Sequence, residues 1–297
     1  MPQKICRITN LWSQCNWQTN ETVSRVIIES TQLFSYQIDY FNQKKVVFNI
    51  LSARANMAPQ TIEVSDGLID KIVIQQLVHD VVGVYIYLNY PMPGKISFQP
   101  GVPARTILSF DRLFIRHLFQ NKIIALDPGH GGNDYGGRGP VSLTEKDVVF
   151  TMTKKLKDLL EQNKARVLLT RETDQNVPLA HRFLLAKKFA ANAFISFHVY
   201  HGASPKVSGL ALKYNPRAEN NFFLAQCVYT ELARKIKRPL RGIKVDRQLC
   251  YLENTPGIIV EPVAISNWTE EGLLRNPTFY EKIAFGVFNG LRKFFSS

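Results

Sequence analysis

The sequence predicts a small all-β sandwich followed by an α/β domain, whose mostly parallel sheet carries helices on both faces. Three observations support this prediction. Short runs rich in β-branched and aromatic residues, separated by Asp-Gly, Pro-Gly and Gly-Val-Pro turns, fill the N-terminal part. From about Arg116 onward, apolar strand-like runs alternate with helical periodicities, which is typical of parallel sheets covered by helices. The length of 297 residues allows two cores, which we assign to residues 1–116 and 117–297.

The strands expected in the first part follow one another closely, as in a β-sandwich. One of them alternates Tyr36, Ile38 and Tyr40 with polar residues, which is the period-two pattern of a strand buried on one side. The complete set covers residues 23–30, 33–41, 44–51, 61–67, 69–77, 83–90, 95–100 and 104–110.

The second part is expected to alternate strands with helices. Strands are predicted at residues 122–126, 166–170, 193–197, 209–214 and 257–260. Between them, apolar residues recur at helical spacing over 148–160, 184–189 and 223–232. A last helix is expected from about Pro277 to Phe295, where it closes the chain.

The composition is that of a globular protein with a basic surplus. Hydrophobic residues make up 45% and charged residues 21% of the chain, and the net charge is +13. A basic surplus favours contact with polyanions such as acidic envelope polymers. The densest basic cluster has no interleaved aromatic residues, so we interpret it as a solvated helix end and loop and expect no nucleic-acid binding. This cluster comprises Arg234, Lys235, Lys237, Arg238, Arg241, Lys244 and Arg247.

Other sequence signals are weak or missing. Cys6, Cys15, Cys227 and Cys250 show no C-x-x-C spacing, so we do not assign them to a metal, and their pairing stays open. No apolar stretch approaches the roughly 18 residues of a membrane span, so no integral membrane segment is expected. The first residues also lack the continuous apolar core of a secretion signal.

Four residues with metal or proton-transfer chemistry are predicted to meet at one edge of the second sheet. His130 comes shortly after a strand, whereas His198 and Glu261 directly end strands. Glu145 follows the loop at 131–142 and opens a helix, which can return it to the same edge. Ligands bind at the carboxyl ends of strands in such sheets. Two imidazoles and one carboxylate around zinc leave a position for water, as a metal-dependent hydrolase requires.

Each of these residues also has a simpler interpretation. Glu145 lies three residues after Ser142 and could complete a capping box at the start of a helix. A histidine that ends a strand is often only a hydrogen-bonded group. Glu261 could be a member of an ion pair. A shared site is favoured because all four groups fall at one edge. The glycines around His130 permit positive φ and close backbone approach. The chain contains neither phosphate-loop motifs nor G-x-S-x-G.

Residues 122–297 resemble the zinc-dependent N-acetylmuramoyl-L-alanine amidases of bacterial cell walls, the Amidase_3 family. The resemblance rests on LDPGHGGND, EKD, LTRETD, ISFH and IIVEPVAISN, in that order. It implies one zinc ion per chain, held by His130, Glu145 and His198, and Glu261 as the catalytic acid/base. The implied substrate is peptidoglycan, cut at the amide between N-acetylmuramic acid and L-alanine.

The N-terminal part, 1–116, resembles the AMIN domain that often precedes such amidases, which implies a role in holding the enzyme on the envelope. The resemblance also implies a periplasmic or envelope location and allows for an activator protein.

The chain departs from the family pattern in two places. Tyr200 and His201 replace an Asn and a small residue, and Pro262 and Val263 follow Glu261 in place of a small residue and an aromatic one. These changes concern substrate fit, and His201 is a further candidate ligand. Two alternatives stay open, namely a zinc peptidase acting within the stem peptide and an inactive wall-binding or regulatory protein.

Overall fold

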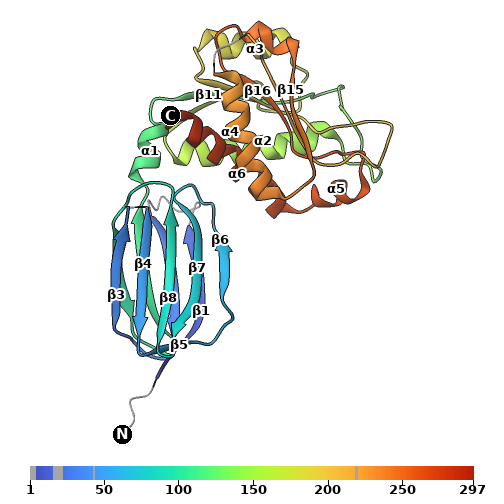
Figure 1. The fold of residues 1–297 in the computed structure, drawn as a ribbon. Coiled ribbons are helices and arrows are strands. Elements are labelled where there is room, and N and C mark those ends of the chain that lie inside the picture. The colour runs from blue at the N-terminus through green and yellow to red at the C-terminus, as the bar shows by residue number, and fades with distance from the viewer. Residues whose placement is uncertain (1–4, 16–22, 43, 218–219) are drawn as a thin grey trace. The chain divides into compact units, whose positions relative to one another are not determined.

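The computed structural model describes residues 5–15, 23–42, 44–217 and 220–297. The chain divides into two compact units, Met1–Ile115 and Arg116–Ser297, and the boundary falls within the short helix α1 (Leu113–Phe119). Figure 1 shows the first unit as strands only and the second as a sheet with helices. Within the described ranges, none of the helices combines the length and apolarity needed to cross a lipid bilayer.

The first unit is a sandwich of two five-stranded sheets, which confirms the predicted fold (Figure 1). One sheet has the order β5 (Ala53–Ala55), β1 (Cys6–Cys15), β2 (Val23–Ser30), β10 (Ala104–Asp111) and β9 (Gly94–Gln99). The other has the order β3 (Tyr36–Phe41), β4 (Lys45–Leu51), β8 (Val81–Leu88), β7 (Ile69–Val78) and β6 (Gln60–Glu63).

All eight predicted strands are present, and the structure adds β1 and β5. Alternate residues of the strands face the core, for example Val46, Phe48 and Ile50 of β4, which are fully buried. Burial of such side chains stabilises the unit by roughly 1.5–3 kcal/mol each.

The second unit contains a six-stranded sheet with flanking helices, which confirms the predicted α/β fold class. Its order is β12 (Arg166–Leu169), β11 (Ile123–Pro128), β13 (Ala193–Phe197), β16 (Gly257–Glu261), β14 (Leu210–Tyr214) and β15 (Leu240–Val245). The first four strands are mutually parallel, whereas β14 is antiparallel to β16 and β15 is parallel to β14. Strand β15 was not predicted because it lies within the basic cluster that we expected to be a solvated helix end and loop.

Helices cover both faces of this sheet (Figure 1). On one face, α3 (Leu179–Lys188) and the 3-10 helix η1 (Arg247–Leu252) pack with Ala125 and Phe194 of the sheet. On the other face lie α2 (Glu145–Gln162) and α4 (Asn221–Ile236), and α6 (Pro277–Phe295) packs against both of these helices. The short helix α5 (Trp268–Leu273) precedes α6. Helix α6 begins at the predicted residue because Asn276 caps it and Pro277 occupies its first position.

Candidate active site

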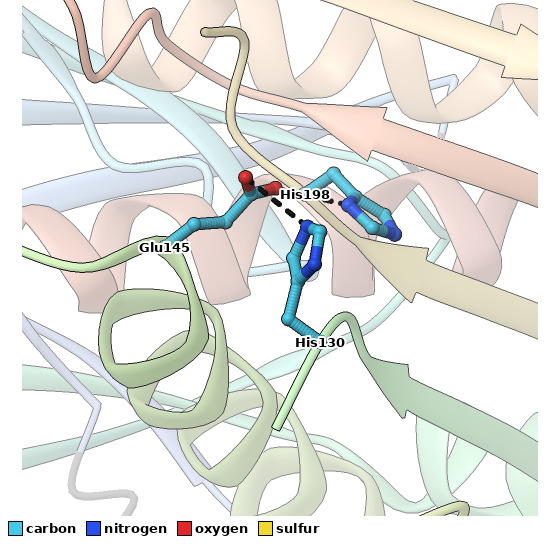
Figure 2. A group of neighbouring side chains, drawn as sticks. All are labelled: His130, Glu145 and His198. Atoms are coloured by element: carbon cyan, nitrogen blue, oxygen red, sulfur yellow. Dashed lines mark hydrogen bonds and ion pairs between the residues drawn. The ribbon is translucent and has the colours of Figure 1, made fainter. Parts of the chain in front are cut away.

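His130, Glu145 and His198 come together at the carboxyl edge of the second sheet. His130 follows β11, His198 follows β13, and Glu145 is the first residue of α2. Each offers a ligand atom, and these atoms all lie within 4.8 Å of one another. Figure 2 shows the carboxylate of Glu145 reaching both imidazole rings. Among the described residues, His201 is not a member of this group.

Glu145 is buried and bridges the two histidines. Its Oε2 lies 3.2 Å from His130 Nε2, and its Oε1 lies 2.9 Å from His198 Nδ1. The backbone N–H groups of Gly137 and Val199 each donate a hydrogen bond to one of the same oxygens, at 2.8 Å and 3.0 Å. Burial alone would raise the pKa of Glu145, but its hydrogen bonds and charge interactions with the two imidazoles outweigh burial and lower that pKa strongly.

The capping-box interpretation of Glu145 is wrong. The N-cap residue of α2 is Thr144, whose side chain makes no capping hydrogen bond, and Ser142 lies two residues farther out with a φ of 68°. The side chain of Glu145 turns toward the histidines instead of folding back on the start of the helix. The Glu145 side chain therefore belongs to the cluster with His130 and His198 and does not cap the helix.

Asp134 orients the ring of His130. Its Oδ2 lies 2.9 Å from His130 Nδ1, and its Oδ1 accepts a hydrogen bond from the N–H of Gly136. Burial would lower the pKa of His130, but the hydrogen bonds and charges of Glu145 and Asp134 outweigh it and raise that pKa. An ionised carboxylate only accepts hydrogen bonds, so Nδ1 of His130 donates to Asp134 and Nε2 is the ring atom that faces Glu145. The two carboxylates thus favour positive charge at this position, which a bound metal ion would also supply.

Two buried arginines hold the loop that carries His130. Arg171 donates hydrogen bonds to the carbonyl oxygens of Pro128 and Gly129, at 3.0 Å and 3.2 Å. Arg182 donates to the carbonyl oxygens of Pro128 and His130, both at 2.8 Å. The sequence motifs alone do not mark these arginines as site residues. Arg171 lies in the LTRETD motif, which was the one available signal.

Glu261 ends β16 beside His198 but has cationic partners of its own. The backbone N–H of His198 donates to the carbonyl of Val260, so the two strands stay paired up to these residues. The carboxylate of Glu261 is buried, with Oε1 at 2.7 Å from Lys213 Nζ and Oε2 at 3.0 Å from Arg241 NH2. Glu261 is not one of the three clustered ligand residues.

The interpretation of the basic cluster as solvated surface is wrong for two of its members. Arg241 pairs with Glu261, and Arg238 Nε donates at 2.9 Å to Glu270, which is fully buried in α5. Both carboxylates are buried, so they need cationic partners from the protein in place of water, and these two arginines supply them. The cluster was misjudged because their partners lie more than 15 residues away in sequence.

The fold and this site define an α/β enzyme with a side-chain cluster that suits a metal ion. Residues 124–293 match the family model described as N-acetylmuramoyl-L-alanine amidase, Amidase_3. The chain belongs to this family, and the activity that the family name denotes is hydrolysis of an amide in peptidoglycan.

Individual relatives agree with this assignment. The chain is 31% identical over 191 residues to the germination-specific N-acetylmuramoyl-L-alanine amidase of Bacillus subtilis, a match that covers 59% of this chain and 80% of that protein. Among solved structures, the amidase AmiC2 of Nostoc punctiforme matches with a TM-score of 0.56 and 29% identity, over 59% of this chain and 98% of that one. The CwlD amidase of Clostridioides difficile, solved in complex with the GerS lipoprotein, matches with a TM-score of 0.56 and 30% identity, over 59% and 99%.

Proposed function

We propose that this amidase is zinc-dependent and cleaves the amide between N-acetylmuramic acid and L-alanine, with His130, Glu145 and His198 as the zinc ligands. The observation that carries the proposal is the buried Glu145 carboxylate, whose two oxygens each face an imidazole nitrogen. Two histidines and one carboxylate form a ligand set that zinc enzymes use, and it leaves a coordination position open.

The residues around the cluster fit such an ion. Glu145 places its two oxygens beside one nitrogen of each imidazole, and Asp134 fixes the His130 ring as the outer partners of zinc-bound histidines do. When bound, the zinc ion supplies a Lewis acid that polarises the substrate carbonyl and increases the acidity of water.

The chain itself supplies proton transfer and orientation. Glu261, at the neighbouring strand end, takes a proton from the attacking water and delivers it to the amine of L-alanine as that amine leaves. Arg171 and Arg182 keep the His130 loop rigid while this occurs, because each of them bonds backbone carbonyls of the loop. Burial of Glu145 keeps its carboxylate directed at the two imidazoles.

Two substitutions test these roles separately. Glu261→Gln is expected to retain near-stoichiometric zinc but to lose turnover by about 10²-fold or more, because the proton acceptor is gone. His130→Ala is expected to lower the zinc content itself. Metal analysis and a dye-release assay on purified sacculi, with and without chelator, measure both effects. Equal turnover of Glu261→Gln and wild type would refute the role of Glu261, and unchanged zinc in His130→Ala would refute that ligand.

The bond that is cut identifies the substrate. Mass spectrometry of digested muropeptides is expected to reveal a free amine on L-alanine. A free amine on a later residue of the stem peptide would instead identify a peptidase.

We further infer that residues 1–116 act as an AMIN-like unit that retains the enzyme on the envelope, and that the protein works in the periplasm or cell envelope. The substrate lies there, and the basic surplus favours acidic envelope polymers. The CwlD relative was solved with a lipoprotein, which supports a search for an activator protein. Co-purification from envelope fractions, compared with cytosol, measures the location.

A further inference from the structure

We propose that Arg241 is a positioning residue that fixes the orientation of the Glu261 carboxylate, and that Tyr200 in turn fixes Arg241. This inference rests on the proposed function, because it assumes that Glu261 transfers the proton. It assigns a role to two residues that lie outside the set of metal ligands.

The guanidinium of Arg241 is held on three sides. Its Nε donates to the carbonyl oxygen of Gly209 at 2.9 Å, its NH2 lies 3.0 Å from Glu261 Oε2, and its centre lies 4.5 Å from the ring centre of Tyr200. The side chain is only 14% exposed. A planar group fixed by a carbonyl, a ring and a carboxylate has one orientation available, so it transmits that orientation to Glu261.

The backbone of β15 is shaped to aim this side chain. Leu210 pairs with Leu240 and Ala211 pairs with Gly242, so Arg241 is the extra residue of a bulge in the ladder between β14 and β15. A bulge redirects one side chain relative to the regular alternation of a strand. The bulge therefore turns Arg241 toward the end of β16.

Lys213 has a different part in this arrangement. Its Nζ lies 2.7 Å from Glu261 Oε1, but its side chain is 32% exposed. An ammonium on a flexible stem supplies charge and little direction. Orientation of the carboxylate thus depends on Arg241.

The residue after Glu261 makes this support necessary. Pro262 has no backbone N–H, so it cannot donate a hydrogen bond to the carboxylate. In the part of the chain that the structure describes, the hydrogen bonds and ion pairs of the Glu261 side chain come from Lys213 and Arg241. The ring of Tyr200 supplies the surface on which the Arg241 guanidinium rests.

The test is a double-mutant cycle between Arg241 and Glu261, measured on full-length, zinc-loaded protein. Arg241→Gln is expected to lower kcat about 10- to 100-fold, with KM and zinc content nearly unchanged, because misplacement of a catalytic group acts on the chemical step. In a Glu261→Gln background, Arg241→Gln is expected to cause no further loss. Lys244→Gln, at an exposed position of the same strand, is the matched control and should leave kcat unchanged.

Two further variants separate positioning from folding. Arg241→Ala is expected to regain part of its turnover when guanidinium is added at millimolar concentration, which a misfolded protein would not do. Tyr200→Leu removes the ring but leaves the ion pair, so a smaller loss of kcat, again absent in the Glu261→Gln background, is expected.

The outcomes for the two proposals differ. An additional loss from Arg241→Gln in the Glu261→Gln background, or an unchanged kcat for Arg241→Gln alone, overturns the positioning role and leaves the proposed function intact. Full turnover by Glu261→Gln alone overturns the proposed role of Glu261, and the positioning role with it.

Discussion

Single glycines determine how closely the candidate metal ligands approach one another. A Cβ on Gly129 would lie 2.4 Å from Cε1 of His198, and a Cβ on Gly136 would lie 2.6 Å from Cδ2 of His130. Gly136 also has a φ of 65°, which side-chain-bearing residues adopt at a cost. The loop can therefore close around the cluster only with glycine at both positions.

Gly129→Ala is expected to weaken zinc binding by about tenfold or more, because the new methyl group displaces the His198 ring. Isothermal titration of the metal-free protein with zinc measures the effect. Gly272→Ala is the matched control, since a Cβ there meets nothing within 4 Å. Equal zinc affinity in Gly129→Ala and Gly272→Ala would show that the close approach does not position the ring.

Tyr280 is expected to make the second unit less stable as the pH rises above 10. Its hydroxyl donates to the carbonyl of Leu274, and burial raises the pKa of Tyr280 to about 12 from an ordinary value of 10.0. The folded pKa is above the unfolded one, so this stabilisation is complete below pH 10 and is lost as pH rises toward 12. Wild type should lose roughly 2 kcal/mol more than Tyr280→Phe across this interval. Urea unfolding at pH 9, 10, 11 and 12 compares the two, and parallel losses would contradict the assignment.

At the scale of elements, the backbone of α6 approaches that of α4 closely at two glycines. A Cβ on Gly286 would lie 2.7 Å from Cα of Leu232, and a Cβ on Gly290 would lie 2.4 Å from Cα of Val228. Two glycines one turn apart thus allow the backbones of α4 and α6 to come into direct contact. The spacing was visible in the sequence, but its meaning depends on which helix lies opposite.

Gly290→Ala is expected to destabilise the second unit by about 1–2 kcal/mol. Alanine gains roughly 1 kcal/mol in helix propensity over glycine, but the contact with backbone atoms of Val228 cannot relax without moving α4. Thermal unfolding should therefore show a lower Tm for this variant than for wild type or Gly272→Ala. A raised Tm would mean that helix propensity outweighs packing.

Elements with regular patterns could be predicted from the sequence, and irregular ones could not. The strands around Val46 and Ile86 and the helix from Pro277 to Phe295 carry clear periodicity. Strand β1 was missed because it is polar and has a register shift between Ile8 and Asn10. β5 was too short to show a pattern, and α5 is held by the contacts of its glutamates.

The candidate site divides in the same way. His130, Glu145 and His198 could be predicted because local motifs mark the ends of the elements that carry them. Arg182 and Arg241 could not, because their roles arise from partners 52 and 20 residues away in sequence. The sequence pattern around such an arginine is that of an exposed residue. Its place in the site follows only from the fold, which brings a buried carbonyl or carboxylate oxygen within hydrogen-bonding distance.

At the scale of the whole molecule, we propose that hydrolysis and retention on the envelope belong to different units. The Nostoc punctiforme amidase is matched over 98% of its length by 59% of this chain, so that solved chain consists of little more than the matched domain. In the first unit, a buried network joins Ser24, Asp66 and Arg112, and the buried apolar side chains of the strands form a core of their own.

A shortened chain of residues 113–297 is expected to keep its zinc and to hydrolyse soluble muropeptides within about threefold of the full chain. Its retention on purified sacculi should fall about tenfold or more, because one of two linked binding units is gone. Sedimentation with sacculi and a muropeptide assay, run in parallel, measure both properties. Equal sedimentation of the two chains would remove the assigned role of the first unit.

The pairing of β13 with β16 has a consequence for how chains of this kind can diverge. His198 and Glu261 are the next residues after the last paired positions of adjacent strands, so their separation follows from the hydrogen-bonded spacing of about 4.8 Å. The long connection between them does not set that distance. Its loops can gain or lose residues over evolutionary time, and can thereby acquire new controls over access, without altering the spacing on which the chemistry depends.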